Sequence, residues 1–93
     1  MEFLRLDDCR VVGTYVVFLS WQTTPGVMTN RWDVRSKEDA DLGLIKWYTS
    51  WRKYCFYPNG FTIFEQVCLR EIAEFIEQET AAHKAARKAA KHV

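Results

Sequence analysis

Aromatic and cationic side chains occur together in one short stretch of the sequence, between residues 47 and 61. Seven aromatic residues fall in these fifteen positions: Trp47, Tyr48, Trp51, Tyr54, Phe56, Tyr57 and Phe61. Lys46, Arg52 and Lys53 are interleaved with them. Proteins that bind single-stranded nucleic acids use this mixture, because rings stack on bases while cations contact phosphates. A thin sheet also fills its core with large rings, so we expect part of the cluster to be structural.

A second cationic feature is the alanine-rich tail, residues 81–93. It carries Lys84, Arg87, Lys88 and Lys91 and no acidic residue, which is a local charge of +4. The chain has 13 basic and 12 acidic residues, so the remaining residues 1–80 carry nine basic and twelve acidic side chains, a net charge of −3. On a helix the four cations form a stripe suited to phosphates or to an acidic groove of a protein. The alternative is a solvated helix end.

The sequence contains no recognisable catalytic constellation. Its only histidines, His83 and His92, lie in the basic tail, and its three serines have no base nearby in sequence. Its four glycines are isolated, so there is no glycine-rich phosphate loop. We therefore expect a protein that is not an enzyme and that needs no cofactor.

Metal binding is also not expected from the residue spacing. The cysteines are odd in number and widely spaced: Cys9, Cys55 and Cys68. This pattern predicts reduced thiols, the last two of them buried, rather than a zinc site or a disulfide framework. Asp33, Asp39 and Asp41 offer oxygen ligands, but their spacing lacks the glycine and the terminal glutamate of a calcium loop.

Strand patterns run through the first two thirds of the chain. They cover residues 2–6 (weakly), 10–21, 31–36, 42–49 and 51–58. The segment 10–21 is predicted as one strand, in which Gly13 marks a bulge or a close approach of the backbone. Short connections between the later strands favour antiparallel neighbours. Strand alternation sends Trp47 and Ile45 to one face and Lys46 and Tyr48 to the other.

One long helix is predicted after the sheet ends at residues 58–60. Thr62 and Glu65 match the capping box T-x-x-E. The apolar face of this helix consists of Phe64, Val67, Cys68, Ile72, Phe75 and Ile76, widened by Leu69 and Ala73. The residues expected to point outward are Glu65, Arg70, Glu71, Glu74 and Glu77. Alanine is the best helix former, so the tail is predicted to continue the helix to about residue 90 and to protrude beyond the sheet.

These elements predict an α+β fold: a two-layer, about four-stranded antiparallel sheet packed by one long C-terminal helix. Residues 1–80 are predicted to be a single α+β domain and residues 81–93 a basic, alanine-rich helical extension. No run of 18 apolar residues occurs, and acidic residues precede the most apolar stretch. We therefore expect a soluble, cytoplasmic protein with no membrane partner.

Three segments resemble small orphan proteins encoded by bacteriophages and prophages. They are residues 32–37 (WDVRSK), 42–58 (LGLIKWYTSWRKYCFYP) and 62–76 (TIFEQVCLREIAEFI). The specific part is the WR-x-YCF-x-P core at residues 51–58, and the resemblance covers about half of the chain. This family has no assigned activity, so the resemblance implies a phage genetic context and a bacterial host cell. Because small phage proteins are often inhibitors or modifiers of host machinery, including restriction and CRISPR systems, the resemblance also implies a role of this kind.

Two functions are compatible with these features. The first is a non-enzymatic, phage-type interaction protein that binds and inhibits a host or anti-phage defence complex. Its predicted partner-binding residues are Trp47, Tyr48, Trp51, Arg52, Lys53, Lys84, Arg87, Lys88 and Lys91. The second is a small nucleic-acid-binding domain that uses the same basic and aromatic patch together with the tail. A homodimer through the alanine stripe or a sheet edge is compatible with both.

Overall fold

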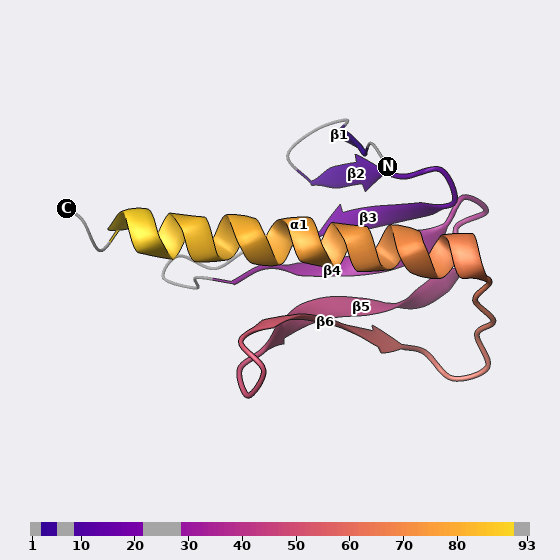
Figure 1. The fold of residues 1–93 in the computed structure, drawn as a ribbon. Helices are drawn as coiled ribbons and strands as arrows, with labels where there is room; N and C mark the ends of the chain where they lie inside the picture. Colours follow the sequence, from indigo (N-terminus) through magenta and orange to yellow (C-terminus); the bar gives the residue numbers. More distant parts are fainter. Residues whose placement is uncertain (1–2, 6–8, 22–28, 91–93) are drawn as a thin grey trace.

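Six strands pair into one antiparallel sheet, and a single long helix covers one of its faces (Figure 1). The computed structural model describes residues 3–5, 9–21 and 29–90. The strands are β1 (Leu4–Arg5), β2 (Arg10–Val12), β3 (Val16–Ser20), β4 (Arg31–Ser36), β5 (Asp41–Tyr48) and β6 (Lys53–Pro58), and the helix is α1 (Gln66–Ala90). Their order across the sheet follows the chain. The predicted α+β fold, an antiparallel sheet with one C-terminal helix, is confirmed.

The sheet has six strands, where about four were expected, mainly because residues 10–21 form a hairpin. The prediction of one strand in this segment was wrong. Strands β2 and β3 are joined through Gly13, Thr14 and Tyr15, and the Gly13 N–H donates to the Val16 carbonyl at 2.9 Å. Apolar, β-branched residues fill both strands, and the turn carries no Asn-Gly or Pro-Gly signal, so composition alone did not reveal it.

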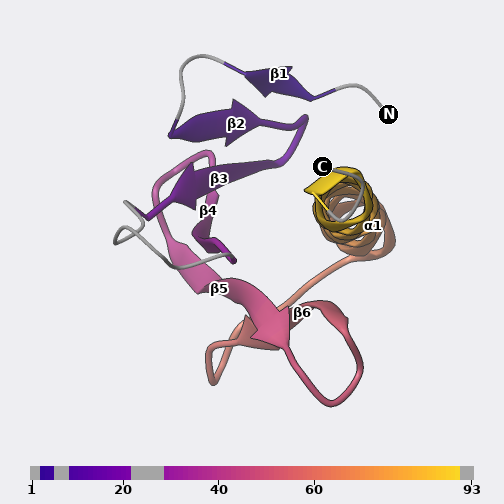
Figure 2. The same ribbon diagram turned by 90° about the vertical axis from the view of Figure 1, so that its left-hand side faces the viewer.

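The hydrophobic core lies between the sheet and α1, and Figure 2 shows the sheet curling around the helix. Phe18, Val34 and Ile45, on neighbouring strands, are each fully buried. Phe75 of α1 stacks on Phe18 with the ring centroids 3.9 Å apart, and Trp32 meets Phe75 edge-on at 5.1 Å. Period-two alternation along the strands thus places large rings beneath the helix.

The helix begins later than predicted and is capped by a different residue. The Glu65 carboxylate accepts a hydrogen bond from the Cys68 N–H, which makes Glu65 the N-cap. The Thr62 hydroxyl instead donates to the Asn59 carbonyl at 2.8 Å, so the predicted capping box does not form. Leu69 is about half exposed and Ala73 is exposed, so they do not widen the buried face as expected.

The C-terminal end of the helix lies where the sequence predicted it. One continuous helix of 25 residues runs through the alanine-rich segment to Ala90, and its C-terminal end extends past the strands (Figure 1). Lys91 lies outside the described residues. Within the described part of the chain, no helix is both long enough and apolar enough to cross a membrane.

Glu71 was predicted to point outward, but its side chain is fully buried. One carboxylate oxygen, Oε1, accepts hydrogen bonds from the Tyr15 and Val16 backbone N–H groups, both at 3.0 Å. A β-carbon on Gly13 would lie 1.7 Å from the same oxygen. The predicted close approach at Gly13 is therefore confirmed, and its partner is this carboxylate. The interaction ties α1 to the β2–β3 turn.

Candidate functional site

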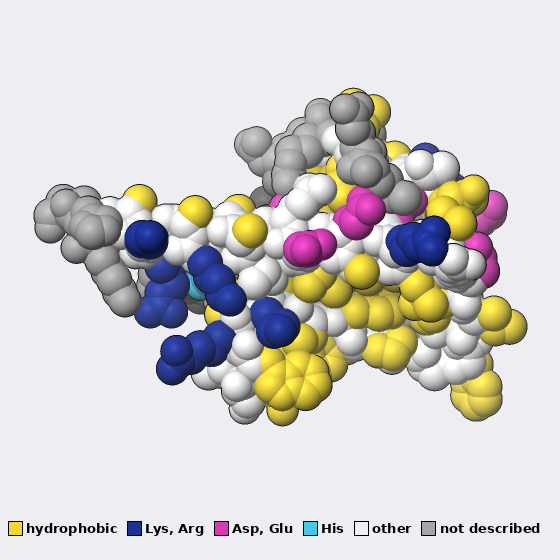
Figure 3. All heavy atoms as spheres, in the orientation of Figure 1, with side chains coloured by type: hydrophobic (Ala, Val, Ile, Leu, Met, Phe, Trp, Pro, Cys, Tyr) yellow, Lys and Arg dark blue, Asp and Glu magenta, His cyan; other side chains and the backbone are white. Residues whose placement is uncertain are grey.

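A basic cleft opens between the end of the β5–β6 hairpin and the C-terminal half of α1. Its volume is about 540 Å³, and it is lined by Trp47, Thr49, Arg52, His83, Lys84, Arg87 and Lys88. Figure 3 shows lysine and arginine side chains gathered around a histidine at this end of the molecule. Four of the seven lining residues are cations and none is acidic. Because the walls come from segments about 30 residues apart, the cleft exists only in the folded chain.

Packing inside the fold sets the position of Trp47 on the floor of the cleft. Strand alternation places it on the same side of β5 as the buried Ile45, as predicted. Its ring lies 5.1 Å from the Tyr54 ring and 4.4 Å from the His83 ring, measured between centroids. Tyr54 is itself held by Trp32 and by a hydrogen bond from the Asn30 N–H to its hydroxyl. Burial raises the pKa of this phenol, which keeps it neutral.

One hydrogen bond docks the C-terminal half of α1 on β6. The Tyr54 N–H, on the side of β6 that faces away from β5, donates to the Thr80 hydroxyl at 3.1 Å. His83 lies three residues after Thr80 and Arg87 four residues after His83, so all three fall on one helical face. This docking brings the helical wall of the cleft against the hairpin.

Arg52 lines the wall of the cleft opposite α1, and its backbone conformation is strained. Its φ is +54°, in the left-handed region that favours glycine, and its N–H donates to the Tyr48 carbonyl at 2.9 Å. An L-residue in this region costs about 1–2 kcal/mol. Strained backbone conformations of this kind often occur at functional sites.

This strain leads to a simple prediction. Arg52→Gly and Arg52→Ala both remove the guanidinium group, but only glycine relieves the backbone. We expect the glycine variant to have a free energy of unfolding about 1 kcal/mol higher than that of the alanine variant. Urea denaturation of the two proteins measures the difference. A glycine variant less stable than the alanine variant would contradict the left-handed conformation at this position.

Two aromatic rings project from the hairpin beside the cleft. Trp51 is 66% exposed and Tyr48 is 37% exposed. They contact each other edge-on, with centroids 4.8 Å apart. We call these two residues the rim pair. Unlike Trp47, they face away from the core, so their surface is available to a partner.

The structure brings together most of the site residues predicted from the sequence. Trp47, Arg52, Lys84, Arg87 and Lys88 line the cleft, and Tyr48 and Trp51 form the rim pair. Lys53 borders a neighbouring groove that also contains Lys84. Lys91 is outside the described residues.

Sequence reasoning missed two lining residues, Thr49 and His83. His83 was considered only as part of the basic tail, although its spacing from Ile76 and Thr80 places it on the helical face that packs against the sheet. Thr49 lies in the hairpin turn, where no sequence signal marked it.

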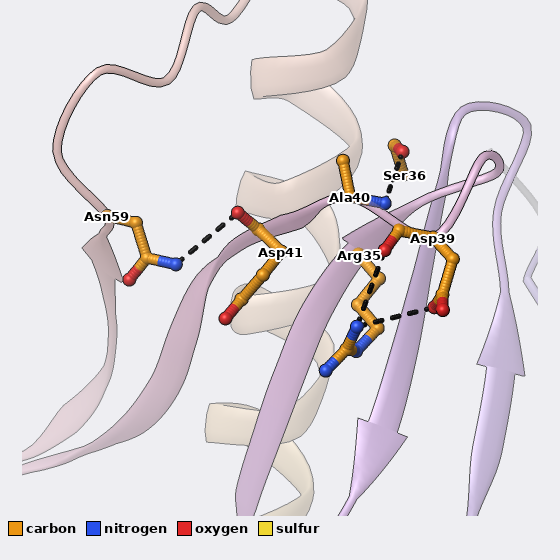
Figure 4. Close-up of polar contacts among 6 residues, drawn as sticks. All are labelled: Arg35, Ser36, Asp39, Ala40, Asp41 and Asn59. Atoms are coloured by element: carbon orange, nitrogen blue, oxygen red, sulfur yellow. Dashed lines mark hydrogen bonds and ion pairs between the residues drawn. The ribbon is translucent and has the colours of Figure 1, made fainter.

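The acidic residues considered as cation ligands do not converge. The Arg35 guanidinium pairs with the Asp39 carboxylate at 3.4 Å, and the Asp41 carbonyl accepts a hydrogen bond from the Asn59 side chain at 3.3 Å (Figure 4). The Asp33 carboxylate accepts a hydrogen bond from the Trp21 indole at 2.9 Å. Among residues 3–5, 9–21 and 29–90, no group of three His, Cys, Asp or Glu side chains could hold a metal ion.

None of the three cysteines, all of which the structure describes, forms a disulfide bond. Cys55 and Cys68 are half-buried, less than the sequence predicted, and Cys9 is exposed. Burial raises the pKa of the Cys68 thiol, and the nearby Glu71 and Glu65 carboxylates raise it further. This environment favours the unreactive thiol form.

Comparison of the chain with protein-family models, with curated proteins and with solved structures finds no match.

Proposed function

We propose that this protein is a non-enzymatic interaction protein that binds an acidic surface of a host or anti-phage defence complex and thereby inhibits it. The observation that carries the proposal is the position of the rim pair, Tyr48 and Trp51, beside a cleft with four cations. The phage context comes from the sequence resemblance at residues 32–76.

The chemistry of this surface suits a protein partner. Tryptophan, tyrosine and arginine are the residue types that dominate binding energy at protein interfaces. Trp51 and Arg52 are adjacent in one hairpin turn, so an aromatic anchor and a cation are presented together. The cations of α1 extend this surface and would steer an acidic partner toward the anchor.

The experiment is affinity capture of the tagged protein from bacterial lysate, with mass spectrometry of what is retained. Nuclease-treated and untreated samples are compared. We expect a specific protein complex that survives nuclease treatment and is retained at least about tenfold less by Trp51→Ala, as for an interface anchor.

The matched control is Phe61→Ala. Phe61 is fully exposed and belongs to the connection between β6 and α1. This connection joins the N-terminal end of α1 (Figure 1), whereas the cleft is lined by residues of its C-terminal half. We expect Phe61→Ala to capture the complex as well as the wild-type protein does. Capture unchanged by Trp51→Ala would contradict the proposal, and so would loss of every partner after nuclease treatment, which would favour nucleic-acid binding instead.

A further inference from the structure

The cations of the cleft are not neutralised within the described part of the protein. Arg52, Lys84, Arg87 and Lys88 form no ion pair there, and no carboxylate lines the cleft. Four like charges around one concavity create a positive potential that attracts anions.

The geometry indicates more than one anionic group. Lys84 and Lys88 are one helical turn apart, which is an axial distance of about 6 Å. Arg52 belongs to the opposite wall. Cations that come from two walls of the cleft and span a helical turn are placed to contact neighbouring anionic groups on one ligand. Arginine binds phosphate oxygens through paired N–H donors and lysine binds them as a point charge.

The remaining lining residues suit a phosphate ester. The Thr49 hydroxyl and the His83 ring add hydrogen-bonding groups to the cations. The volume of about 540 Å³ lies in the range of small-molecule sites. Because Trp47 packs against both Tyr54 and His83, the exposed ring of Trp51 is the better platform for a base.

We infer that the cleft binds two or more linked phosphate groups, carried either by a free polyphosphate or nucleotide or by a short single strand of nucleic acid. This goes beyond the proposed function, because the purified chain should show it with no protein partner present. The two functions are linked: a bound polyphosphate neutralises the cations that an acidic protein surface would contact, so we expect it to weaken capture of that partner.

Isothermal titration calorimetry with the full chain at low salt tests this inference. The probes are pyrophosphate, ATP and a four-residue oligothymidylate, with inorganic phosphate for comparison. We expect at least one linked-phosphate probe to bind more tightly than inorganic phosphate. The affinity for it should fall at least about tenfold in Lys84→Gln/Arg87→Gln, which removes two charged donors from exposed helix positions.

A matched control removes the same charge elsewhere. Arg10 and Lys37 border a different groove, on β2 and the β4–β5 turn. Arg10→Gln/Lys37→Gln should leave binding within about twofold of wild type when the titration is repeated at about 0.1 M salt, because these cations line another groove and charges that do not contact the ligand are then largely screened. Equal losses in the two double variants would overturn the inference, as would the absence of binding by every linked-phosphate probe.

Two further readouts separate the sources of the phosphate and the two functions. Tighter binding of the oligothymidylate, lost in Trp51→Ala, supports a nucleic-acid strand, whereas pyrophosphate or ATP binding that is unchanged in Trp51→Ala supports a free ligand. Capture of a protein complex is scored separately with the same variants. Phosphate binding without capture of a protein complex would support this inference and contradict the proposed function. Capture of a protein complex without phosphate binding would contradict this inference and support the proposed function.

Discussion

Glu71→Ala should lower the free energy of unfolding by about 3 kcal/mol. The substitution leaves the Tyr15 and Val16 N–H groups without their acceptor, and each such loss costs about 1–3 kcal/mol. It also opens a cavity where a fully buried side chain was. Relief of the desolvation of a buried carboxylate offsets part of this loss. Denaturation by urea, followed by circular dichroism, measures the change.

Two further variants show whether the carboxylate itself is responsible. Glu77 is an exposed glutamate on the same helix, so Glu77→Ala has the same change in helix propensity without the buried contacts. We expect Glu77→Ala to change stability by no more than about 0.5 kcal/mol. Glu71→Gln keeps one oxygen acceptor and should fall between the two. Equal effects of the alanine variants at 71 and 77 would show that Glu71 does not hold the β2–β3 turn.

The second large effect is expected at Gly13. A β-carbon there would lie 1.7 Å from Glu71 Oε1 and 2.4 Å from Glu71 Cδ, well inside contact distance. The carboxylate cannot move away without breaking its hydrogen bonds to Tyr15 and Val16. We therefore expect Gly13→Ala to lower the free energy of unfolding by about 2 kcal/mol, as other overpacked sites do.

A double-mutant cycle gives this prediction its sharpest test. In the Glu71→Ala background the clash is gone, so Gly13→Ala should be close to neutral, or stabilising by a few tenths of a kcal/mol through a less flexible unfolded chain. The expected coupling energy between the two positions is thus about 2 kcal/mol. Additive effects of the two substitutions would mean that Gly13 is required for a reason other than the nearby carboxylate.

Local patterns were sufficient for most of the secondary structure. Residues 31–36 form a strand with the predicted bounds, because Trp32 and Val34 alternate with polar neighbours. Alternation also placed Trp47 on the face of Ile45 and Tyr48 on the opposite face, and the structure shows that the first of these faces packs against the core. Helix propensity predicted one helix to about residue 90. The hairpin at Gly13 and the cap at Glu65 were missed, because each depends on a particular hydrogen-bond partner rather than on residue type.

Most residues of the candidate site were predicted from the sequence, but their arrangement in one cleft was not. Composition identified two separate features, a mixed aromatic and basic cluster in the strands and a basic stripe in the tail. Their meeting in a single cleft depends on where α1 docks on β6, through Thr80 and His83. No local sequence pattern predicts that Arg52 and Arg87 line the same cleft.

Local periodicity of apolar residues was sufficient to predict the fold class, the faces of strands such as residues 31–36, and the C-terminal extent of the helix. Tertiary packing, in contrast, buries Glu71 against Gly13, places His83 on Trp47 and brings four cations into one cleft. Those contacts join residues far apart in the chain. They form when the helix packs on the curved sheet, and no single stretch of the sequence is enough to predict them.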